Sequence, residues 1–264
     1  MKGENRMKTN NCWISLSLSV LMCFLLACPH TTPNPVAELE YYFPPNYVHQ
    51  TIQIPETMRQ SSDSVAQVVT QYIDLINESK KFLPYINPPD SILLESKVEP
   101  VWNYKWLAKE GFYLFLKISI YPDNSCGWEA KLWGTDTTTG QYYHNWIFLN
   151  AGQSSGKDQG SISPHYIDAP HIITSYSWGV ADDTLKYIYY KISDEGKLFS
   201  DLEIHGCSDF SGELIKRIMI SDTGFYLREY NGVIEYKYTW NVNGRGQWWR
   251  YDIEGNIIDS GVWN

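Results

Sequence analysis

Turn-forming residues recur every 9 to 14 residues along the last third of this chain, and this spacing constrains the fold more than any other feature of the sequence. The runs between the turns are rich in aromatic and β-branched residues, which favour β-strands. Such short intervals leave room for hairpins but not for crossover helices, so successive strands should pair antiparallel. Strands are predicted at 111–121, 141–150, 185–192, 213–220 and 233–241, with turns at 123–124, 136–140, 194–196, 221–224, 231–232, 243–244 and 254–256.

Residues 62–83 have a helical pattern instead. The segment 61–64 offers serine and aspartate side chains that can cap a helix N-terminus. Pro84 follows Lys80 and Lys81 and is expected to end the helix. The apolar residues fall on one face, at Val65, Val68, Val69, Tyr72 and Ile76. A single apolar stripe predicts that the helix lies on the sheet.

The predicted fold is mainly β, an α+β arrangement in which an antiparallel β-meander forms a curved sheet with one N-terminal amphipathic helix packed on it. A half-barrel around the helix and a two-sheet sandwich both fit this pattern. Residues 28–57 are rich in proline at their start and are predicted as an irregular lead-in. No long linker divides the rest, so residues 58–264 are predicted to form a single domain.

Residues 1–27 have the organisation of an export signal. Lys2, Arg6 and Lys8 precede an apolar stretch at 13–26. A helix of that length spans about 21 Å, short of the roughly 30 Å hydrocarbon core, so the stretch is not a membrane-spanning helix. The sequence Leu25-Leu26-Ala27-Cys28 follows. It resembles the lipobox of bacterial lipoproteins, in which the signal peptide is cut before the cysteine and the thiol receives diacylglycerol.

The resemblance implies a protein held to a bilayer by lipid on Cys28, with fatty acids such as palmitate as the anchor. Two or three acyl chains give stable anchoring where one chain would not. Residue 29 is proline and not the aspartate that retains such lipoproteins in the inner membrane, so the expected location is the outer membrane of the cell envelope. An ordinary secretory signal followed by a coincidental cysteine is the alternative.

The charge balance narrows the classes of partner. Hydrophobic residues make up 43% of the chain, which predicts a folded body. Removal of residues 1–27 leaves 18 basic and 29 acidic residues, a net charge of −11. This balance excludes nucleic acid as a partner, and it should also repel anionic lipid, so the acyl chains would supply the membrane attachment. No cofactor is predicted.

Cys126 and Cys207 remain once the signal and the anchor are set aside. Each lies beside a glycine in a turn-like segment. In an oxidising compartment they can form a disulfide, worth about 4 kcal/mol in the chain-entropy model because the closed loop is long. Two separate free thiols are the alternative.

The segment Gly152-Gln153-Ser154-Ser155-Gly156 has the pattern of a serine-hydrolase nucleophile elbow. That motif needs a strand, a tight turn and then a helix. The following residues carry glycine and proline but no apolar helical stripe, so a flexible loop is the alternative to Ser154 as a nucleophile. A general base would have to come from a histidine such as His165, His171 or His205.

Two sets of ligand-type side chains are regularly spaced, and each is a candidate metal or catalytic site. The first lies in a predicted loop, 151–171, where the spacing imposes no geometry. The second alternates along a predicted strand and would share one of its faces. Ordinary solvated side chains are the alternative for both. The sets are His165, Asp168 and His171, and Asp201, Glu203 and His205.

Aromatic residues give the strongest functional signal in the body of the chain. Ten of the 11 tryptophans lie after residue 100. Rings in a row can stack on sugars or line an apolar cleft, and they can equally fill the core of a large curved sheet. The candidate ligand-binding aromatics are Trp102, Tyr104 and Trp106 on one strand, and Tyr236, Tyr238 and Trp240 on another.

The C-terminal tail resembles one unit of the MORN-variant repeats of bacteria, through GQWWRYD at 246–252, GNI at 255–257 and SGVW at 260–263. The resemblance covers about 20 residues and occurs once. Because a repeat needs neighbours of its own kind to bury a core, we treat it as a shared hairpin pattern from which no function follows.

Together these features favour a non-enzymatic, membrane-anchored envelope protein that binds a glycan, a lipid or a protein through an aromatic surface. A carrier of apolar ligands is one alternative, by analogy of shape alone. A serine hydrolase using Ser154 is the other. A deep apolar cavity between helix and sheet would favour the carrier, and a solid core with exposed rings would favour the binding protein.

Overall fold

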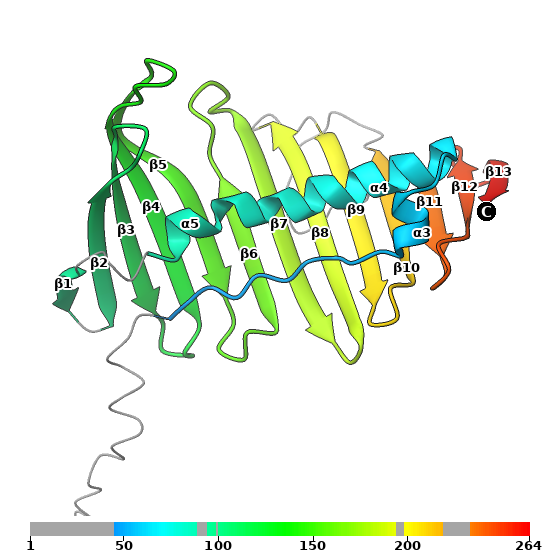
Figure 1. Ribbon diagram of the computed structural model, residues 1–264, viewed down its shortest axis with the longest axis horizontal. Helices are drawn as coiled ribbons and strands as arrows, with labels where there is room; N and C mark the ends of the chain where they lie inside the picture. Colours follow the sequence, from blue (N-terminus) through cyan, green and yellow to red (C-terminus); the bar gives the residue numbers. More distant parts are fainter. Residues whose placement is uncertain (1–44, 89–93, 99, 194–197, 219–232) are drawn as a thin grey trace, which may run out of the picture. The chain divides into compact units, whose positions relative to one another are not determined.

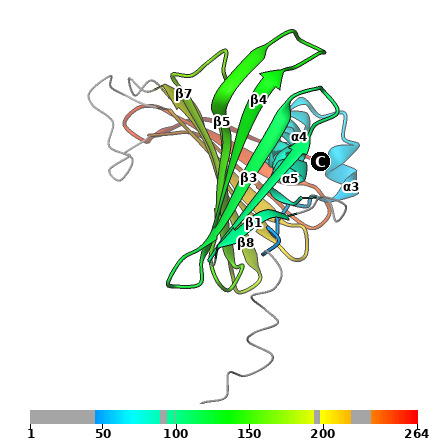
Figure 2. The same ribbon diagram turned by 90° about the vertical axis from the view of Figure 1, so that its left-hand side faces the viewer.

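The strands of this protein pair in the order in which they occur in the chain. The computed structural model describes residues 45–88, 94–98, 100–193, 198–218 and 233–264, which belong to one unit, Pro45–Asn264. Within them, 13 strands form one unclosed, curved sheet (Figures 1 and 2). The strands are β1 (Leu94–Val98), β2 (Val101–Leu107), β3 (Tyr113–Ile120), β4 (Cys126–Thr135), β5 (Tyr142–Gln153), β6 (Gln159–Pro164), β7 (Ile172–Ala181), β8 (Thr184–Ser193), β9 (Leu198–Cys207), β10 (Gly212–Ile218), β11 (Val233–Trp240), β12 (Gly246–Tyr251) and β13 (Ile257–Trp263).

Every pairing between neighbouring strands is antiparallel, which confirms the predicted meander. The two-sheet sandwich is wrong, because all described strands lie in one sheet. The predicted loop at 151–171 is also wrong in part, since it contains the end of β5 and all of β6. Glycine, serine and a terminal proline give β6 a weak strand signal. The turns predicted at 194–196, 221–224 and 231–232 lie outside the described residues.

Four hairpin turns share one backbone geometry. In the turn at Asn241, its N–H donates to the Arg245 carbonyl (3.0 Å) and its carbonyl accepts from the Gly244 N–H (2.9 Å). The same pair of bonds begins at Tyr121, Cys207 and Asp252. The fourth residue of each turn has a positive φ, which glycine and asparagine adopt most readily. These residues are Asn124, Phe210, Gly244 and Gly255.

A helical segment crosses one face of the sheet (Figure 1). It comprises α3 (Glu56–Arg59), α4 (Ser64–Asn77), the 3-10 helix η1 (Glu78–Phe82) and α5 (Leu83–Ile86). Asp63 caps α4 by accepting from the N–H groups of Val65 and Ala66. Pro84 does not end the helical path as predicted, because it occupies the first turn of α5. A backbone N–H in the first turn has no partner within the helix, so proline, which lacks this group, is tolerated there. No helix in the described ranges is long and apolar enough to cross a membrane.

Residues 45–55 run in extended form across the same face of the sheet as α4 (Figure 1). Three side-chain amides hold this lead-in by bonding both the N–H and the carbonyl of one backbone residue. Asn87 bonds Tyr47 in this way (2.9 and 3.2 Å), Gln153 bonds Val48 (3.1 and 2.8 Å) and Asn77 bonds Ile52 (3.0 and 2.8 Å). These bonds satisfy backbone groups that have no strand partner, so the lead-in packs as an ordered part of the unit.

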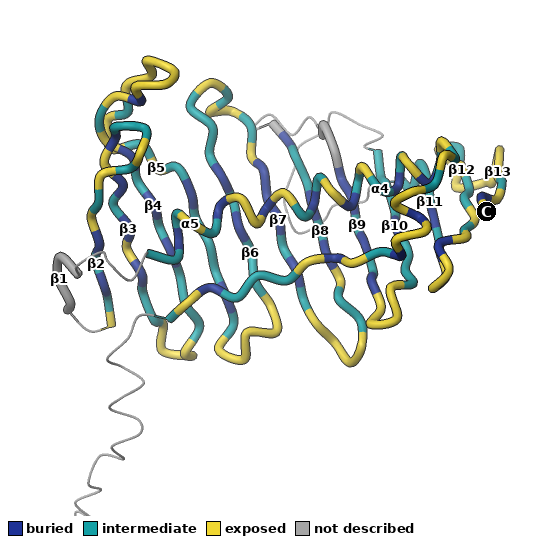
Figure 3. Tube along the Cα trace, in the orientation of Figure 1, coloured by how far each residue is buried: buried dark blue, intermediate teal, exposed yellow. Residues whose placement is uncertain are grey.

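The core lies between the helical segment and the sheet face beneath it, which we call the inner face (Figure 3). Ala66, Val69, Ile73 and Ile76 of α4 have no accessible surface. Several inner-face residues of the sheet are equally enclosed, including Trp102, Leu114, Ile118, Leu202 and Leu214. A water-sized cavity beside these side chains would give them accessible surface, so they are packed solid against one another.

Tryptophans on the inner face pack against glycines directly across from them on the next strand. Trp178 faces Gly160, Trp240 faces Gly212 and Trp263 faces Gly246. The indole N–H of Trp240 donates to the Phe210 carbonyl (2.8 Å), and that of Trp263 donates to the Gly244 carbonyl (2.8 Å). Gly212 and Gly246 thus each let an indole ring lie flat over a neighbouring strand, where the ring N–H bonds the adjacent hairpin turn.

Candidate functional site

Most of the aromatic residues predicted to bind a ligand belong to the core. Trp102 and Tyr104 lie on the inner face of β2, and Tyr238 and Trp240 lie on the inner face of β11, all four buried. Trp106 and Tyr236 are partly buried against the same core. The six rings therefore do not form an exposed binding face.

Exposed rings gather instead on the opposite face of β2 to β5, the outer face, which turns away from the helical segment. Leu107, Tyr113 and Trp133 stand directly beside one another across three strands. Trp133 also lies against His144, with ring centroids 4.4 Å apart. We call this surface the outer patch; it consists of Leu107, Tyr113, Phe115, Trp133, Tyr142, His144 and Ile147, with Lys105, Lys117 and Lys131 among them.

Five members of the outer patch are among the 14 large hydrophobic residues exposed in the described part of the chain: Leu107, Tyr113, Trp133, Tyr142 and Ile147. A monomer rarely leaves such residues together without a use for them. The sequence did not predict this face, because rings that share a strand are recognisable in a sequence, whereas these rings adjoin across strands. The alternation of Tyr113 and Phe115 with Leu114 and Leu116 was the available signal.

Lysines give the outer patch a positive charge. The ammonium of Lys105 lies 5.0 Å from the centre of the Tyr113 ring and 5.1 Å from that of Phe115. Lys131 pairs with Glu129 on its own strand (2.9 Å). The outer-face positions of β2 to β4 hold three lysines and one glutamate, a local charge of +2 within a chain of net charge −9.

The geometry around Ser154 is that of a hairpin turn. The hydroxyl of Ser154 donates to Asp158 (2.5 Å) and accepts from the N–H of Gln159 (3.1 Å). Residues 154–158 connect β5 to β6, so no helix follows the serine. The strand-turn-helix geometry of a nucleophile elbow is absent here, and no described hydrogen bond joins Ser154 to a histidine.

Neither predicted set of metal-type ligands forms a metal site. His165 bonds the side chain of Asn150 (3.0 Å), and within the described ranges no group of three or more His, Cys, Asp or Glu could hold a metal ion. Glu203 on the outer face of β9 is instead paired with two cations, Lys186 (2.6 Å) and Arg217 (2.5 Å), and its carboxylate also contacts the His205 ring (2.7 Å). Burial would raise the pKa of Glu203, but these contacts lower it to about 2.

Cys126 and Cys207 are free thiols, so the predicted disulfide is not formed. They lie on β4 and β9, and four strands separate them in the sheet. At about 4.8 Å per strand their separation is on the order of 20 Å, far beyond the roughly 7 Å that a disulfide can bridge between Cα atoms. Burial raises the pKa of the Cys126 thiol, which makes it a poor nucleophile.

A buried polar network that the sequence did not predict links the lead-in, η1 and β8. Nε2 of His49 lies 2.8 Å from the Ser79 hydroxyl, and that hydroxyl lies 2.9 Å from the Tyr187 hydroxyl. Ser79 also donates to the Ile76 carbonyl, and both Ser79 and Tyr187 have no accessible surface. A serine and a histidine at this distance suggest a catalytic pair, but no substrate could reach the enclosed hydroxyl. The network is therefore structural.

His49 makes stability depend on pH. Burial, aided by the charge of Lys80, lowers the pKa of His49 from 6.5 to about 4. Folding thus favours the neutral ring, so this contribution is complete above pH 6.5 and is lost as the pH falls from there towards 4. We expect the free energy of unfolding to drop by about 1–2 kcal/mol between pH 7 and 4.5, less than the full pKa change implies because the ring is partly accessible.

Urea titrations at several pH values measure this dependence. His49→Gln keeps a hydrogen-bonding group near Ser79 but cannot gain a proton, so most of the slope should disappear. Burial also lowers the pKa of His165, which leaves a smaller residual slope of the same sign. A slope that His49→Gln leaves unchanged would assign the effect to other groups.

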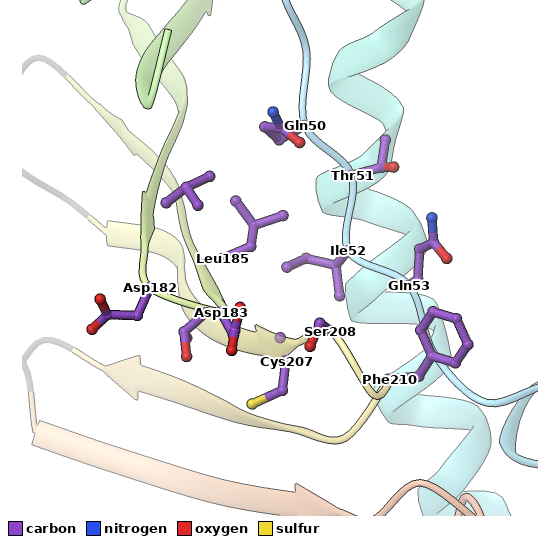
Figure 4. A pocket seen from close by; sticks show the side chains of 13 residues that line it. Gln50, Thr51, Ile52, Gln53, Asp182, Asp183, Leu185, Cys207, Ser208 and Phe210 are labelled. Atoms are coloured by element: carbon purple, nitrogen blue, oxygen red, sulfur yellow. The ribbon is translucent and has the colours of Figure 1, made fainter. Parts of the chain in front are cut away.

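A cavity of about 350 Å³ lies between the lead-in, the ends of β7 to β9 and the turn that follows β9 (Figure 4). Ile52 and Leu185 point towards each other across it, and glutamines and aspartates surround them (Figure 4). The thiol of Cys207 is exposed beside it, with no histidine among the lining residues. The cavity therefore lacks a nucleophile paired with a base, and its mixed lining does not single out a ligand.

Comparison of the sequence with protein-family models and with curated proteins gives no match.

Proposed function

We propose that this protein is a lipid-anchored lipoprotein of the cell envelope, of the outer membrane, that binds its partner through the outer patch without catalysing a reaction. The observation that carries the proposal is the cluster of exposed rings on the outer face of β2 to β5. Such a cluster exposes apolar area that water does not favour, and its lysines and rings offer a partner both charge and flat surface. The export signal and Cys28, which lie outside the described residues, supply the anchor in this proposal.

The solid core supports this function over the carrier. A carrier would hold an apolar ligand between helix and sheet, but the side chains of α4 there have no accessible surface. The hydrolase has less support still, because Ser154 bonds Asp158 and Gln159 rather than a histidine. The outer patch, in contrast, gathers exposed rings and aliphatic side chains on one continuous face of four neighbouring strands.

Replacement of Cys28 tests the anchor. Cys28→Ser removes the thiol that would receive lipid, so we expect the protein to shift from the membrane fraction to the soluble fraction and to incorporate no labelled palmitate. Cys126→Ser, which changes a thiol of the body, should leave both properties unaltered. If Cys28→Ser stayed in the membrane fraction as firmly as the unaltered protein, the anchor would be disproved.

The binding role is tested by mass spectrometry of material that co-purifies with the detergent-extracted protein. We expect a bound component that is lost in the double variant Tyr113→Ala, Trp133→Ala. Trp249→Ala is the matched control, because Trp249 lies beside Lys237 on the outer face at the other end of the sheet. Identical co-purified material from all three proteins would rule out the outer patch as the binding surface.

A further inference from the structure

The outer patch combines three features that one kind of partner would use together. Tyr113, Trp133 and Tyr142 are exposed rings with polar atoms, Leu107 and Ile147 are exposed aliphatic side chains, and three lysines lie among them. Tyrosine and tryptophan favour the headgroup level of a bilayer, where one end of the ring is apolar and the other is wet. Lysine beside them extends its ammonium to lipid phosphates while its stem covers apolar surface.

Charge decides which partner fits best. The chain as a whole has a net charge of −9 and is repelled by anionic lipid, but the outer-face positions of β2 to β4 carry +2. An anionic bilayer attracts each lysine that lies near its surface, and this attraction fades within a Debye length. Only this end of the outer face would therefore turn towards such a surface, while the acidic remainder turns away.

The chemistry of the patch favours a lipid surface over a glycan. Glycan sites need side chains that accept hydrogen bonds from sugar hydroxyls, and carboxylate and amide side chains are few on the outer face of β2 to β4. Glu129 is paired with Lys131 (2.9 Å). Leu107 and Ile147, in contrast, suit the acyl boundary of a bilayer. A second copy of the same patch would bring lysines against lysines.

We propose that the outer patch docks on the surface of an anionic phospholipid bilayer, with the rings at headgroup level and Lys105, Lys117 and Lys131 on lipid phosphates. The inference rests on the proposed function, because it names the partner of the same patch. Docking would hold the sheet by its N-terminal strands against the membrane that carries the lipid anchor. The repulsion from anionic lipid that the sequence predicts follows from the total charge alone and does not describe the charge of this patch.

Lysine footprinting of the full chain tests the docking. The protein is reconstituted into vesicles of phosphatidylcholine alone or mixed with phosphatidylglycerol, and lysine acylation is quantified by mass spectrometry. In the anionic vesicles we expect Lys105, Lys117 and Lys131 to be acylated at about one third of their rate in phosphatidylcholine vesicles, or more slowly still. High salt should restore the rate. Lys186 and Lys237 are matched controls on the outer face of β8 and β11, and they should react equally in both lipids.

The double variant Tyr113→Ala, Trp133→Ala should lose the protection, and Trp249→Ala should keep it. Equal acylation of Lys105 in the two lipids would overturn the docking. If that result came with patch-dependent co-purified glycan or protein, the patch would still be the binding surface and only the lipid partner would be refuted. If neither protection nor patch-dependent material were found, the proposed function would fail as well.

Discussion

Trp102→Ala is expected to lower the free energy of unfolding by about 4 kcal/mol, the largest effect of any single change considered for this chain. The Trp102 ring has 0% exposure and lies on the inner face of β2, within the core that the helical segment covers. Its removal leaves a cavity that the surrounding strands cannot close, because their hydrogen-bonded register fixes their spacing. Urea unfolding followed by circular dichroism gives the measurement.

Trp133→Ala is the matched variant for this measurement. The two residues are the same chemical type on nearby strands, but Trp133 is 40% exposed on the outer face. We expect its replacement to cost about 1 kcal/mol or less, since the site can fill with water. Similar losses from Trp102 and Trp133 would contradict the assignment of one ring to the core and the other to a surface.

Gly212→Ala should destabilise the protein by about 2–3 kcal/mol although it adds only one methyl group. A Cβ at Gly212 would lie 2.5 Å from the Trp240 ring and 2.5 Å from the His205 carbonyl oxygen. The carbonyl belongs to the adjacent strand and cannot move without breaking the β9–β10 pairing. The indole would therefore be displaced from its position over β10, with loss of its bond to Phe210.

Gly152→Ala provides the comparison for Gly212→Ala. Gly152 also lies in a strand, but a Cβ added there would lie 3.5 Å from its nearest neighbour, the Ser161 hydroxyl, which is an ordinary contact distance. Thermal unfolding should show a clearly lower midpoint for Gly212→Ala and a midpoint close to the unaltered protein for Gly152→Ala. Equal midpoints for the two variants would show that the tryptophan does not depend on the glycine.

The local elements of the fold follow from the sequence because they depend on near neighbours. The turns at 123–124, 243–244 and 254–256 contain residues that accept a positive φ, and the structure has hairpins there. Asp63 was among the predicted caps and does cap α4. Runs of aromatic and β-branched residues predicted β3, β5, β8, β10 and β11 to within three residues of their ends. β6 was missed because its serines and glycine pack well only between two formed strands.

The candidate site could not be found in the same way. Trp102 and Trp133 are equally aromatic in the sequence, and both strands carry apolar residues on both faces. Which ring is buried depends on which face the helical segment covers, and that is a matter of packing between elements far apart in the chain. Likewise, the outer patch exists only because strand pairing places Leu107, Tyr113 and Trp133 side by side on three strands, so it depends on the register of those strands.

The sequence by itself determined the antiparallel meander and the position of the helix, because each depends on residues close together in the chain. The lipid anchor at Cys28 also depends on neighbouring residues, and it stays a prediction. Only the tertiary structure decided that the sheet is single and open, that Cys126 and Cys207 lie too far apart to bond, and that Tyr113, Trp133 and Tyr142 gather on the outer face of β2 to β5. The physical reason is that burial and pairing are properties of contacts between distant segments, and neither composition nor periodicity specifies which of two apolar faces those contacts will cover.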